Sequence, residues 1–250
     1  MHISPWIDCR FKEPIEVSLA RIEAQEHRRF LKSHLPLTAL PLYEDVKYIH
    51  VARDGRDACM SMHNHLSGYT EEALALFDKI GLEDDAIGRP YPRVPSDPAD
   101  FFHTWVAGGA PQTSHFDFFD FELSWWDARQ RPNILLVHYN DLKADLSGEM
   151  QRIAEFLDIR VAPEIWPELV STASFDAMQR DGPTLVSAVT FLFDTGSQRF
   201  FHKGTNERWR GLFREEDLAA YDAKIEARFP PECALWVARG RLEAGDPRLM

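Results

Sequence analysis

The 250-residue sequence contains no long apolar run and no closely spaced pair of cysteines. Its longest apolar runs, such as the one at 134–137, are far too short to span a lipid bilayer. A charged segment followed by an apolar one, the mark of a secretory signal, does not open the chain. Cys9, Cys59 and Cys233 form no CxxC pair, so the sequence suggests neither a zinc site nor a disulfide framework. We therefore expect a cytoplasmic protein that makes no contact with a membrane.

Basic residues are also scarce relative to acidic ones. The chain has 28 Lys and Arg against 40 Asp and Glu, which gives a formal net charge of −12 at pH 7. A general nucleic-acid binder needs a basic surface, so this balance argues against nucleic acid as a partner. The length and the hydrophobic content of 44% suit one large domain, which we take to span residues 1–250.

Strand and helix patterns alternate along the chain. Apolar runs at 46–52 and 134–139 predict buried strands, and 29–32 is a shorter candidate. The run ILLVHY at 134–139 is continuously apolar, as is typical of parallel sheets covered on both faces. Helices are expected at 14–27, 54–66, 98–107, 118–129, 140–157, 163–172, 174–180, 215–229 and 231–239, with loops at 83–98 and 182–198. The alternation predicts an α/β fold with a parallel sheet.

The junction VARDGRDACMS at 51–61 joins an expected strand to an expected helix. The start of a helix presents free backbone N–H groups and partial positive charge, which together attract an anion. Asp54 is a plausible N-cap, and Asp57 lies at the third helical position, where an acidic residue is favoured. Arg53 at the strand end and Ser61 in the helix would complete a phosphate site, because a guanidinium grips phosphate oxygens as a fork.

Five separated stretches resemble, in order, the soluble sulfotransferases that use 3′-phosphoadenosine 5′-phosphosulfate (PAPS). FLKSHLPL at 30–37 looks like the Lys-Thr-His-Leu-Pro strand of that family, and 51–61 looks like its 3′-phosphate site. HKGTNERWRG at 202–211 resembles the C-terminal segment of the family, while VHYNDLK and TASFDAM resemble its two adenine segments. The resemblance covers nearly the whole chain. It implies a three-layer α/β sandwich of the P-loop-NTPase type, built on a parallel sheet.

The resemblance also implies roles for individual residues. His34 would be the catalytic base that takes a proton from the acceptor hydroxyl, and Lys32 would offset charge on the transferred sulfuryl group. The donor PAPS would be bound by Arg53, Ser61, Tyr139, Phe175, Met178, Lys203 and Gly204. The acceptor would be a hydroxyl or an amine of a small molecule, and no metal is implied. Residues 83–129, which are rich in aromatics, would form the acceptor side and its lid, suited to an apolar alcohol, phenol or amine.

Two residues depart from the C-terminal pattern of the family. His202 stands where an arginine is usual, and Glu207 lies near a position where glycine is common. A glutamate close to a phosphate is unfavourable unless its side chain points away. Both departures would weaken phosphate binding.

The glycine-rich segment that opens the family is not recognisable. That segment, of the type Pro-Lys-Ser-Gly-Thr-Thr-Trp, cradles the 5′-phosphosulfate, yet the first 29 residues here contain no glycine. We therefore expect a chain that is N-terminally truncated relative to the family, with an incomplete sheet. The alternative is a catalytically inactive or truncated relative that at most binds the nucleotide. A nucleotide kinase shares the general fold, but the KSH and SFxxM stretches have no reason to exist in one.

Overall fold

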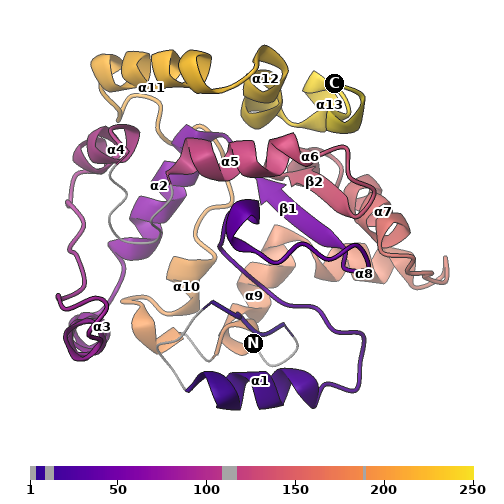
Figure 1. The fold of residues 1–250 in the computed structure, drawn as a ribbon, viewed down its shortest axis with the longest axis horizontal. Helices are drawn as coiled ribbons and strands as arrows, with labels where there is room; N and C mark the ends of the chain where they lie inside the picture. The colour runs from indigo at the N-terminus through magenta and orange to yellow at the C-terminus, as the bar shows by residue number, and fades with distance from the viewer. Residues whose placement is uncertain (1–3, 9–13, 109–116, 188–189) are drawn as a thin grey trace.

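The computed structural model describes residues 4–8, 14–108, 117–187 and 190–250. Helices surround a small central sheet (Figure 1). In that sheet β1 (Tyr48–Ala52) and β2 (Ile134–His138) pair in parallel, with Tyr48 opposite Ile134 and Ala52 opposite His138. The α/β class with a parallel sheet is therefore as expected.

The two strands differ in how well they are covered. All five residues of β2 are buried, in agreement with the continuous apolar run that predicted the strand. On β1, His50 and Ala52 are buried, whereas Val51 between them is 56% exposed. The described residues therefore cover both faces of β2 and only one face of β1.

The main hydrophobic core lies on that covered face. It is formed largely by aromatic side chains such as Phe102, Phe119, Trp126 and Trp236. The helices α4 (Pro98–Val106), α5 (Phe118–Asp127), α11 (Glu215–Arg228) and α12 (Pro231–Arg239) contribute these residues and lie together at the top of Figure 1. The remaining helices are α1 (Ile15–Glu23), α2 (Gly55–Leu66), α3 (Glu71–Glu83), α6 (Tyr139–Ala144), α7 (Leu146–Phe156), α8 (Trp166–Thr172), α9 (Phe175–Leu185), α10 (Ser197–Phe200) and α13 (Arg241–Ala244), with 3-10 turns at Leu37–Ala39, Thr190–Leu192 and Pro247–Leu249.

Three expected elements were wrong in detail. The candidate strand at 29–32 is reduced to one parallel bridge between Trp6 and Lys32, because only residue 32 forms ladder hydrogen bonds there. The expected helix at 140–157 breaks at Asp145, whose side chain accepts a hydrogen bond from the N–H of Gly148 and so caps a new helix, α7. α9 continues through Pro183 to Leu185, so the start of the expected loop at 182–198 is helical.

The longest helix that was not anticipated is α3 (Glu71–Glu83). α3 begins after Thr70, whose hydroxyl accepts a hydrogen bond from the N–H of Ala73. Glu71 and Glu72 occupy its first turn, where acidic side chains are favoured by the helix dipole. These local signals were present in the sequence and would have predicted the helix.

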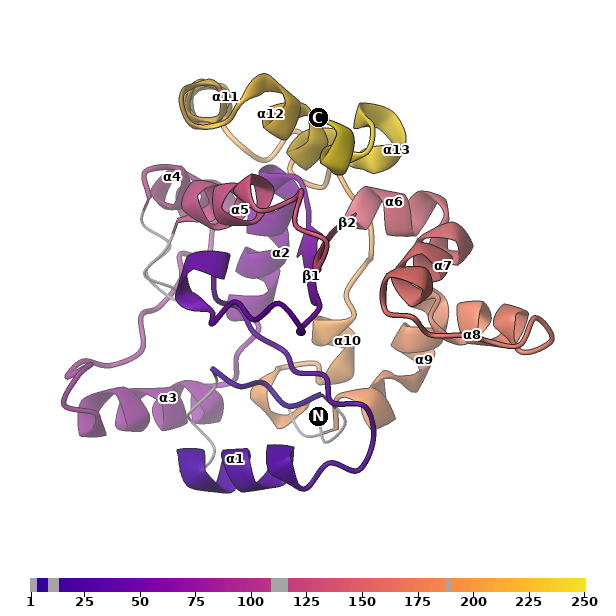
Figure 2. The same ribbon diagram turned by 45° about the vertical axis from the view of Figure 1, so that its right-hand side comes forward.

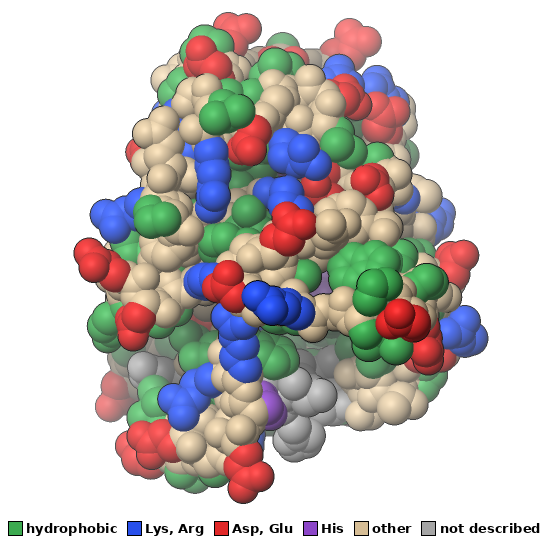
Figure 3. Space-filling model, turned by 90° about the vertical axis from the view of Figure 1, so that its right-hand side faces the viewer, with side chains coloured by type: hydrophobic (Ala, Val, Ile, Leu, Met, Phe, Trp, Pro, Cys, Tyr) green, Lys and Arg blue, Asp and Glu red, His purple; other side chains and the backbone are tan. Residues whose placement is uncertain are grey.

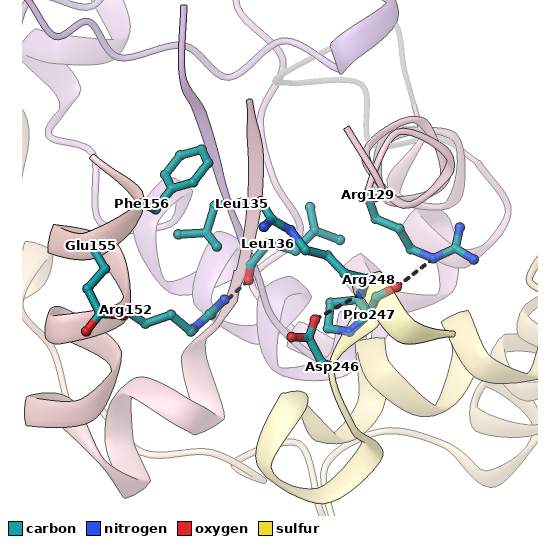
Figure 4. A pocket seen from close by; sticks show the side chains of 9 residues that line it. All are labelled: Arg129, Leu135, Leu136, Arg152, Glu155, Phe156, Asp246, Pro247 and Arg248. Atoms are coloured by element: carbon teal, nitrogen blue, oxygen red, sulfur yellow. Dashed lines mark hydrogen bonds between the residues drawn. The ribbon is translucent and has the colours of Figure 1, made fainter. Parts of the chain in front are cut away.

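Arginine side chains cover the outer edge of β2 (Figure 4). Arg152 donates a hydrogen bond to the carbonyl oxygen of Leu136 at 2.9 Å, and Arg248 donates one to that of Ile134 at 2.6 Å. Arg152 also pairs with the buried carboxylate of Glu149 at 2.7 Å. A cavity of about 240 Å³ lies beside this edge, but the arginines that line it already have partners. They satisfy backbone carbonyls on a strand edge, where unpaired groups are costly.

No described helix is both long and apolar enough to cross a bilayer. The described ranges also hold no group of three or more His, Cys, Asp and Glu side chains arranged to bind a metal ion. Cys59 and Cys233 are free thiols buried in the core, while Cys9 lies outside the described residues.

Candidate active site

The junction between β1 and α2 forms as the sequence predicted. Asp54 caps α2, since its carboxylate accepts a hydrogen bond from the N–H of Arg56 at 2.9 Å. Asp57 in the first turn is buried and accepts a hydrogen bond from the N–H of Glu207 at 2.7 Å. The second contact joins the helix start to a segment 150 residues later in the chain. It brings residues 202–208 to the end of β1.

Arg53 is held at this junction by hydrogen bonds, but one of its N–H donors has no partner among the described residues. Its Nη2 donates to the carbonyl oxygen of Thr205 at 3.1 Å and to Oδ1 of Asn206 at 2.8 Å. Its guanidinium lies 4.3 Å from the ring centroid of Tyr139. Its Nε is buried and has no hydrogen-bond partner among the described residues. Burial lowers the pKa of Arg53, although nearby Asp57 opposes this. An anion bound here would satisfy the free donor.

These residues border a cavity of about 180 Å³, which we call the basic cavity. Its lining comes from the end of β1, from α2, α6, α9 and α10, and from the segment after α10. The lining residues are Arg53, Ser61, Asn64, His65, Tyr139, Phe175, Arg199, Phe200, His202, Lys203, Gly204, Thr205 and Arg208. Six of the nine predicted site residues are therefore brought together around one cavity. Met178 is half-buried one turn after Phe175 and is not part of the lining.

Positive charge in the basic cavity is largely uncompensated. Arg199 pairs with Asp194 at 2.5 Å, but Arg53, Lys203 and Arg208 form no ion pair with any described carboxylate. Burial and the neighbouring Arg53 lower the pKa of Arg208. Such mutual repulsion between cations in a concave site is relieved by binding an anion. The net charge of −12 is thus locally reversed around the basic cavity. On the face drawn in Figure 3, by contrast, Lys and Arg side chains lie interspersed with Asp and Glu side chains.

His202, which replaces the usual arginine, also lines the basic cavity. Its Nδ1 is buried without a hydrogen-bond partner among the described residues. Burial and the charges of Arg208, Lys203 and Arg199 lower the pKa of His202. The ring is therefore neutral at pH 7 when the cavity holds no anion.

Glu207 turns away from the basic cavity. Its carboxylate pairs with Arg210 at 2.7 Å, and the residue is not part of the lining. The expected penalty of an acidic side chain beside the phosphate therefore does not arise. The backbone of Glu207 has a φ of 61°, which belongs to the left-handed region that favours glycine.

The segment after α10 is anchored by side-chain amides. Nε2 of Gln179 donates to the carbonyl oxygens of Phe201 and His202, both at 2.9 Å. Asn206 donates to Oδ1 of Asn140 at 2.7 Å, and Lys143 donates to the carbonyl oxygen of Gly204. These contacts fix Lys203 and Gly204 on the wall of the basic cavity.

Lys32 and His34 lie outside the lining of the basic cavity. The ring of His34 packs against Trp6 with centroids 4.5 Å apart, and the backbone N–H of His34 donates to Oδ2 of Asp8 at 3.1 Å. Surrounding protein atoms and the charge of Lys32 lower the pKa of His34, while Asp8 opposes them. The imidazole is therefore neutral near pH 7 and can accept a proton.

His65 connects these two residues to the basic cavity. Burial and then the charges of Lys32 and His34 lower its pKa to about 4, so both groups act on a residue of the lining. Figures 1 and 2 both show the stretch between α1 and β1, which carries Lys32 and His34, passing beside α9 and α10. The segment that carries the predicted base therefore passes beside two of the helices that line the basic cavity.

Six lining residues were missed from the sequence: Asn64, His65, Arg199, Phe200, Thr205 and Arg208. The first two follow Ser61 at spacings of three and four, which places them on the same face of a helix. That spacing could have revealed them. Arg199 reaches the basic cavity through tertiary packing, since its Nη1 donates to Oδ1 of Asn64 at 3.1 Å.

The aromatic side chains of 83–129 lie mainly in the core. Phe101, Phe102, Trp105, Phe119, Trp125 and Trp126 are all buried there. Phe116 lies outside the described residues. An acceptor role for this region stays a prediction, because these six aromatics pack in the hydrophobic core.

Comparison with known proteins adds to this picture. The family described as the sulfotransferase domain matches residues 1–230. The chain is 29% identical to a glycolipid sulfotransferase of Mycobacterium bovis over 255 residues, and 30% identical to that of Mycobacterium tuberculosis over 254 residues. Each alignment covers 96% of this chain and 78% of the relative. Rat sulfotransferase 1C2 is 26% identical over 85% of this chain and 65% of its own length.

Solved structures share the fold. Mouse sulfotransferase SULT7A1 complexed with PAP superposes with a TM-score of 0.68 at 18% identity, over 90% of this chain and 73% of that one. Retinol dehydratase in complex with androsterone and the inactive cofactor PAP gives a TM-score of 0.66 at 26% identity, over 88% and 58%. The expected α/β fold class is confirmed by these likenesses.

Proposed function

Because the chain belongs to the sulfotransferase family, we propose that it transfers a sulfuryl group from PAPS to a hydroxyl or an amine of a small acceptor. The observation that carries the proposal is the basic cavity. Six residues predicted for the nucleotide, drawn from 53 to 204 in the chain, line one small space with uncompensated positive charge.

The lining fits a nucleotide that carries a 3′-phosphate. Arg53 and Ser61 would hold the phosphate through a guanidinium fork and a hydroxyl, and Lys203 would close over it. The buried Nε of Arg53, which has no partner among the described residues, is a donor that the phosphate would satisfy. The rings of Tyr139 and Phe175 offer apolar surface to the adenine.

The chemistry would be an in-line displacement at sulfur. The acceptor oxygen forms a bond to sulfur while the bond from sulfur to the 5′-phosphate oxygen breaks, and its electron pair leaves with the nucleotide. His34 takes the proton of the acceptor hydroxyl, which its lowered pKa permits at neutral pH. Lys32 offsets the negative charge that develops on the sulfuryl oxygens.

The relatives indicate the class of acceptor. Two of them are named glycolipid sulfotransferases, and retinol dehydratase has been solved with androsterone and with retinol. All of these names point to hydroxyl groups on molecules with large apolar parts. We propose an acceptor of the same kind for this chain.

The decisive experiment is a calorimetric titration with 3′-phosphoadenosine 5′-phosphate, with 5′-AMP as the control nucleotide. We expect binding that depends on the 3′-phosphate and weakens at least ten-fold in Arg53→Ala. Arg210→Ala is the matched control, because it removes a nearby arginine that is exposed and paired with Glu207 outside the lining. Equal affinity for the two nucleotides would overturn the proposal. Nucleotide binding without sulfuryl transfer would favour the alternative, a catalytically inactive relative.

A further inference from the structure

Two asparagine side chains connect Arg53 to the end of α12. Nη2 of Arg53 donates a hydrogen bond to Oδ1 of Asn206 at 2.8 Å, and Nδ2 of Asn206 donates one to Oδ1 of Asn140 at 2.7 Å. Nδ2 of Asn140 in turn donates to the carbonyl oxygen of Arg239, the last residue of α12, at 3.3 Å. Figures 1 and 2 both show α6, which carries Asn140, just below α12 and α13. The basic cavity is thereby joined to a helix end that lies outside its lining.

Each amide in this chain of hydrogen bonds has one orientation that satisfies both of its neighbours. The carbonyl oxygen of Arg239 can only accept, so the NH2 group of Asn140 faces it and Oδ1 of Asn140 faces Asn206. The NH2 group of Asn206 then faces Asn140, and its Oδ1 faces the guanidinium of Arg53, which can only donate. Asn140 is also fixed through its backbone N–H, which donates to Nδ1 of His138 at 3.1 Å. We call the side chains of Asn140 and Asn206 the amide relay.

The amide relay holds Arg53 without neutralising it. An amide oxygen carries no net charge, so the contact with Asn206 leaves the positive charge of the guanidinium in place. Nη2 also donates to the carbonyl oxygen of Thr205, but Nε and Nη1 form no hydrogen bond with any described residue. Arg199 in the same cavity shows the opposite arrangement, because its Nε and Nη2 donate to the carboxylate of Asp194 at 3.0 and 2.5 Å. Arg53 is therefore left for an anion from outside the protein, whereas Arg199 already has an anionic partner.

We propose that the amide relay makes the basic cavity selective for a nucleotide with a 3′-phosphate, because it fixes Arg53 and leaves the charge of Arg53 to the phosphate. Asn206 and Asn140 are thus positioning residues that act through Arg53. The inference rests on the proposed sulfotransferase function and extends it to the choice of nucleotide. A carboxylate at position 206 would hold the guanidinium equally well, but it would form an ion pair with Arg53 and repel the phosphate.

Substitutions at position 206 separate this role from a purely structural one. Asn206→Ala should weaken the binding of 3′-phosphoadenosine 5′-phosphate about ten-fold, the effect of one lost hydrogen bond to a charged group, and leave the affinity for 5′-AMP unchanged. Asn206→Asp keeps an oxygen beside Arg53 but adds a negative charge, so it should weaken the binding further than Asn206→Ala does. A purely structural role would instead weaken the binding of both nucleotides alike, with Asn206→Asp as the milder change.

A double substitution tests whether Asn206 acts through Arg53. Arg53→Ala combined with Asn206→Ala should bind 3′-phosphoadenosine 5′-phosphate no more weakly than Arg53→Ala alone. Asn140→Ala should have a smaller effect than Asn206→Ala, since Arg53 then keeps its direct partner. Asn133→Ala is the matched control, because the amide of Asn133 also donates to two backbone carbonyl oxygens but lies outside the lining of the basic cavity.

The amide relay can also be tested without nucleotide. The guanidinium signals of Arg53 are recorded by NMR in the free 250-residue chain and assigned by their loss in Arg53→Ala. Because Nη2 is held by two acceptors, the guanidinium should rotate slowly and give separate Nη signals in the wild type and in Asn133→Ala. In Asn206→Ala these signals should average.

Two results would overturn the inference: an unchanged ratio of the two nucleotide affinities in Asn206→Ala, or the same Arg53 signals in Asn206→Ala and the wild type. Normal nucleotide binding by the wild type with either of these results would count against this inference alone. If the wild type binds neither nucleotide, the proposed function fails, and the NMR comparison decides on the amide relay. Averaged signals in Asn206→Ala would then still support the positioning of Arg53 by Asn206, and unchanged signals would refute it.

Discussion

Gly204 packs directly against the ring of Phe175, which lies 29 positions earlier in the chain. A Cβ atom on residue 204 would stand 2.7 Å from Cδ2 of that ring. The backbone of Gly204 also has a φ of 61°, a conformation that other residues adopt at a cost. Both residues line the basic cavity, so this part of its wall can pack closely only because residue 204 has no side chain.

Gly204→Ala is therefore expected to deform the basic cavity. The new methyl group must displace the ring of Phe175, and we expect the affinity for 3′-phosphoadenosine 5′-phosphate to fall about ten-fold or more, with a stability loss of about 1–3 kcal/mol. Calorimetry and urea unfolding measure the two effects. Gly88→Ala is a matched control, because Gly88 has the same φ of 61° but open space around its Cβ position. Equal effects of the two substitutions would show that contact with Phe175 is unimportant.

His202 is expected to make nucleotide binding depend on pH. Arg208, Lys203, Arg199 and burial lower its pKa in the free protein, whereas a bound phosphate would raise it. Binding therefore takes up a proton, and the contribution of His202 to affinity grows as pH falls from about 7 toward 5.

The readout is the difference in affinity between the wild type and His202→Gln across that pH range, since the phosphate groups titrate alike in both proteins. His65, with a pKa of about 4, stays neutral over most of the range. His202→Arg should bind more tightly and lose the pH dependence. Parallel pH profiles for the wild type and His202→Gln would contradict this prediction.

His34→Ala is expected to lower kcat by about 100-fold or more, the usual contribution of a general base. The affinity for 3′-phosphoadenosine 5′-phosphate should not change, because His34 lies outside the lining of the basic cavity. In the wild type, kcat/KM should rise with pH and level off above a pKa below 6.5, since Lys32 and surrounding atoms lower the pKa of His34. His27→Ala is the control for loss of an exposed histidine. Normal turnover in His34→Ala would remove the residue from the mechanism.

The arginines on the β2 edge are expected to differ in their effect on stability. Arg152→Ala leaves the buried carboxylate of Glu149 with Arg241 alone and frees the carbonyl oxygen of Leu136, which should cost about 2–4 kcal/mol. Arg248→Ala frees the carbonyl oxygen of Ile134 and removes a guanidinium that lies 5.8 Å from the ring centroid of Phe156, which should cost about 1 kcal/mol. Urea unfolding of the two variants measures both. An equal cost would show that the pairing with Glu149 adds nothing.

The ion pair of Glu149 and Arg152 also makes the stability of the protein depend on pH. Burial raises the pKa of Glu149, but the hydrogen bonds from Arg152 and Arg241 outweigh it and hold the pKa below its ordinary value. The stabilisation is therefore present above the unfolded-state pKa of about 4.5 and is lost as pH falls through the lower folded-state pKa. The difference in unfolding free energy between the wild type and Arg152→Ala should shrink at low pH to the cost of the lost hydrogen bond to Leu136.

Several features of this protein were determined by the sequence alone. The apolar run ILLVH predicted β2, and the Asp54 cap predicted the start of α2, because both depend on residues that are close together in the chain. Ordered short motifs predicted six residues that share the basic cavity, since each motif sets its own turn or helix start. The positive φ of Gly204, which favours a residue without a Cβ atom, is also a local property of the chain.

Only the tertiary structure decided which of these segments meet. It added His65, Asn64, Arg199 and Arg208 to the basic cavity, because α2 packs against α10 and the segment that follows it, more than 130 residues later in the sequence. It also reduced the candidate strand at 29–32 to a single bridge and placed the aromatics of 83–129 in the core. Neighbouring residues set the local preferences for helix, strand and turn. Which charges and rings come together depends on how hydrophobic faces bury one another, and no short stretch of sequence contains that information.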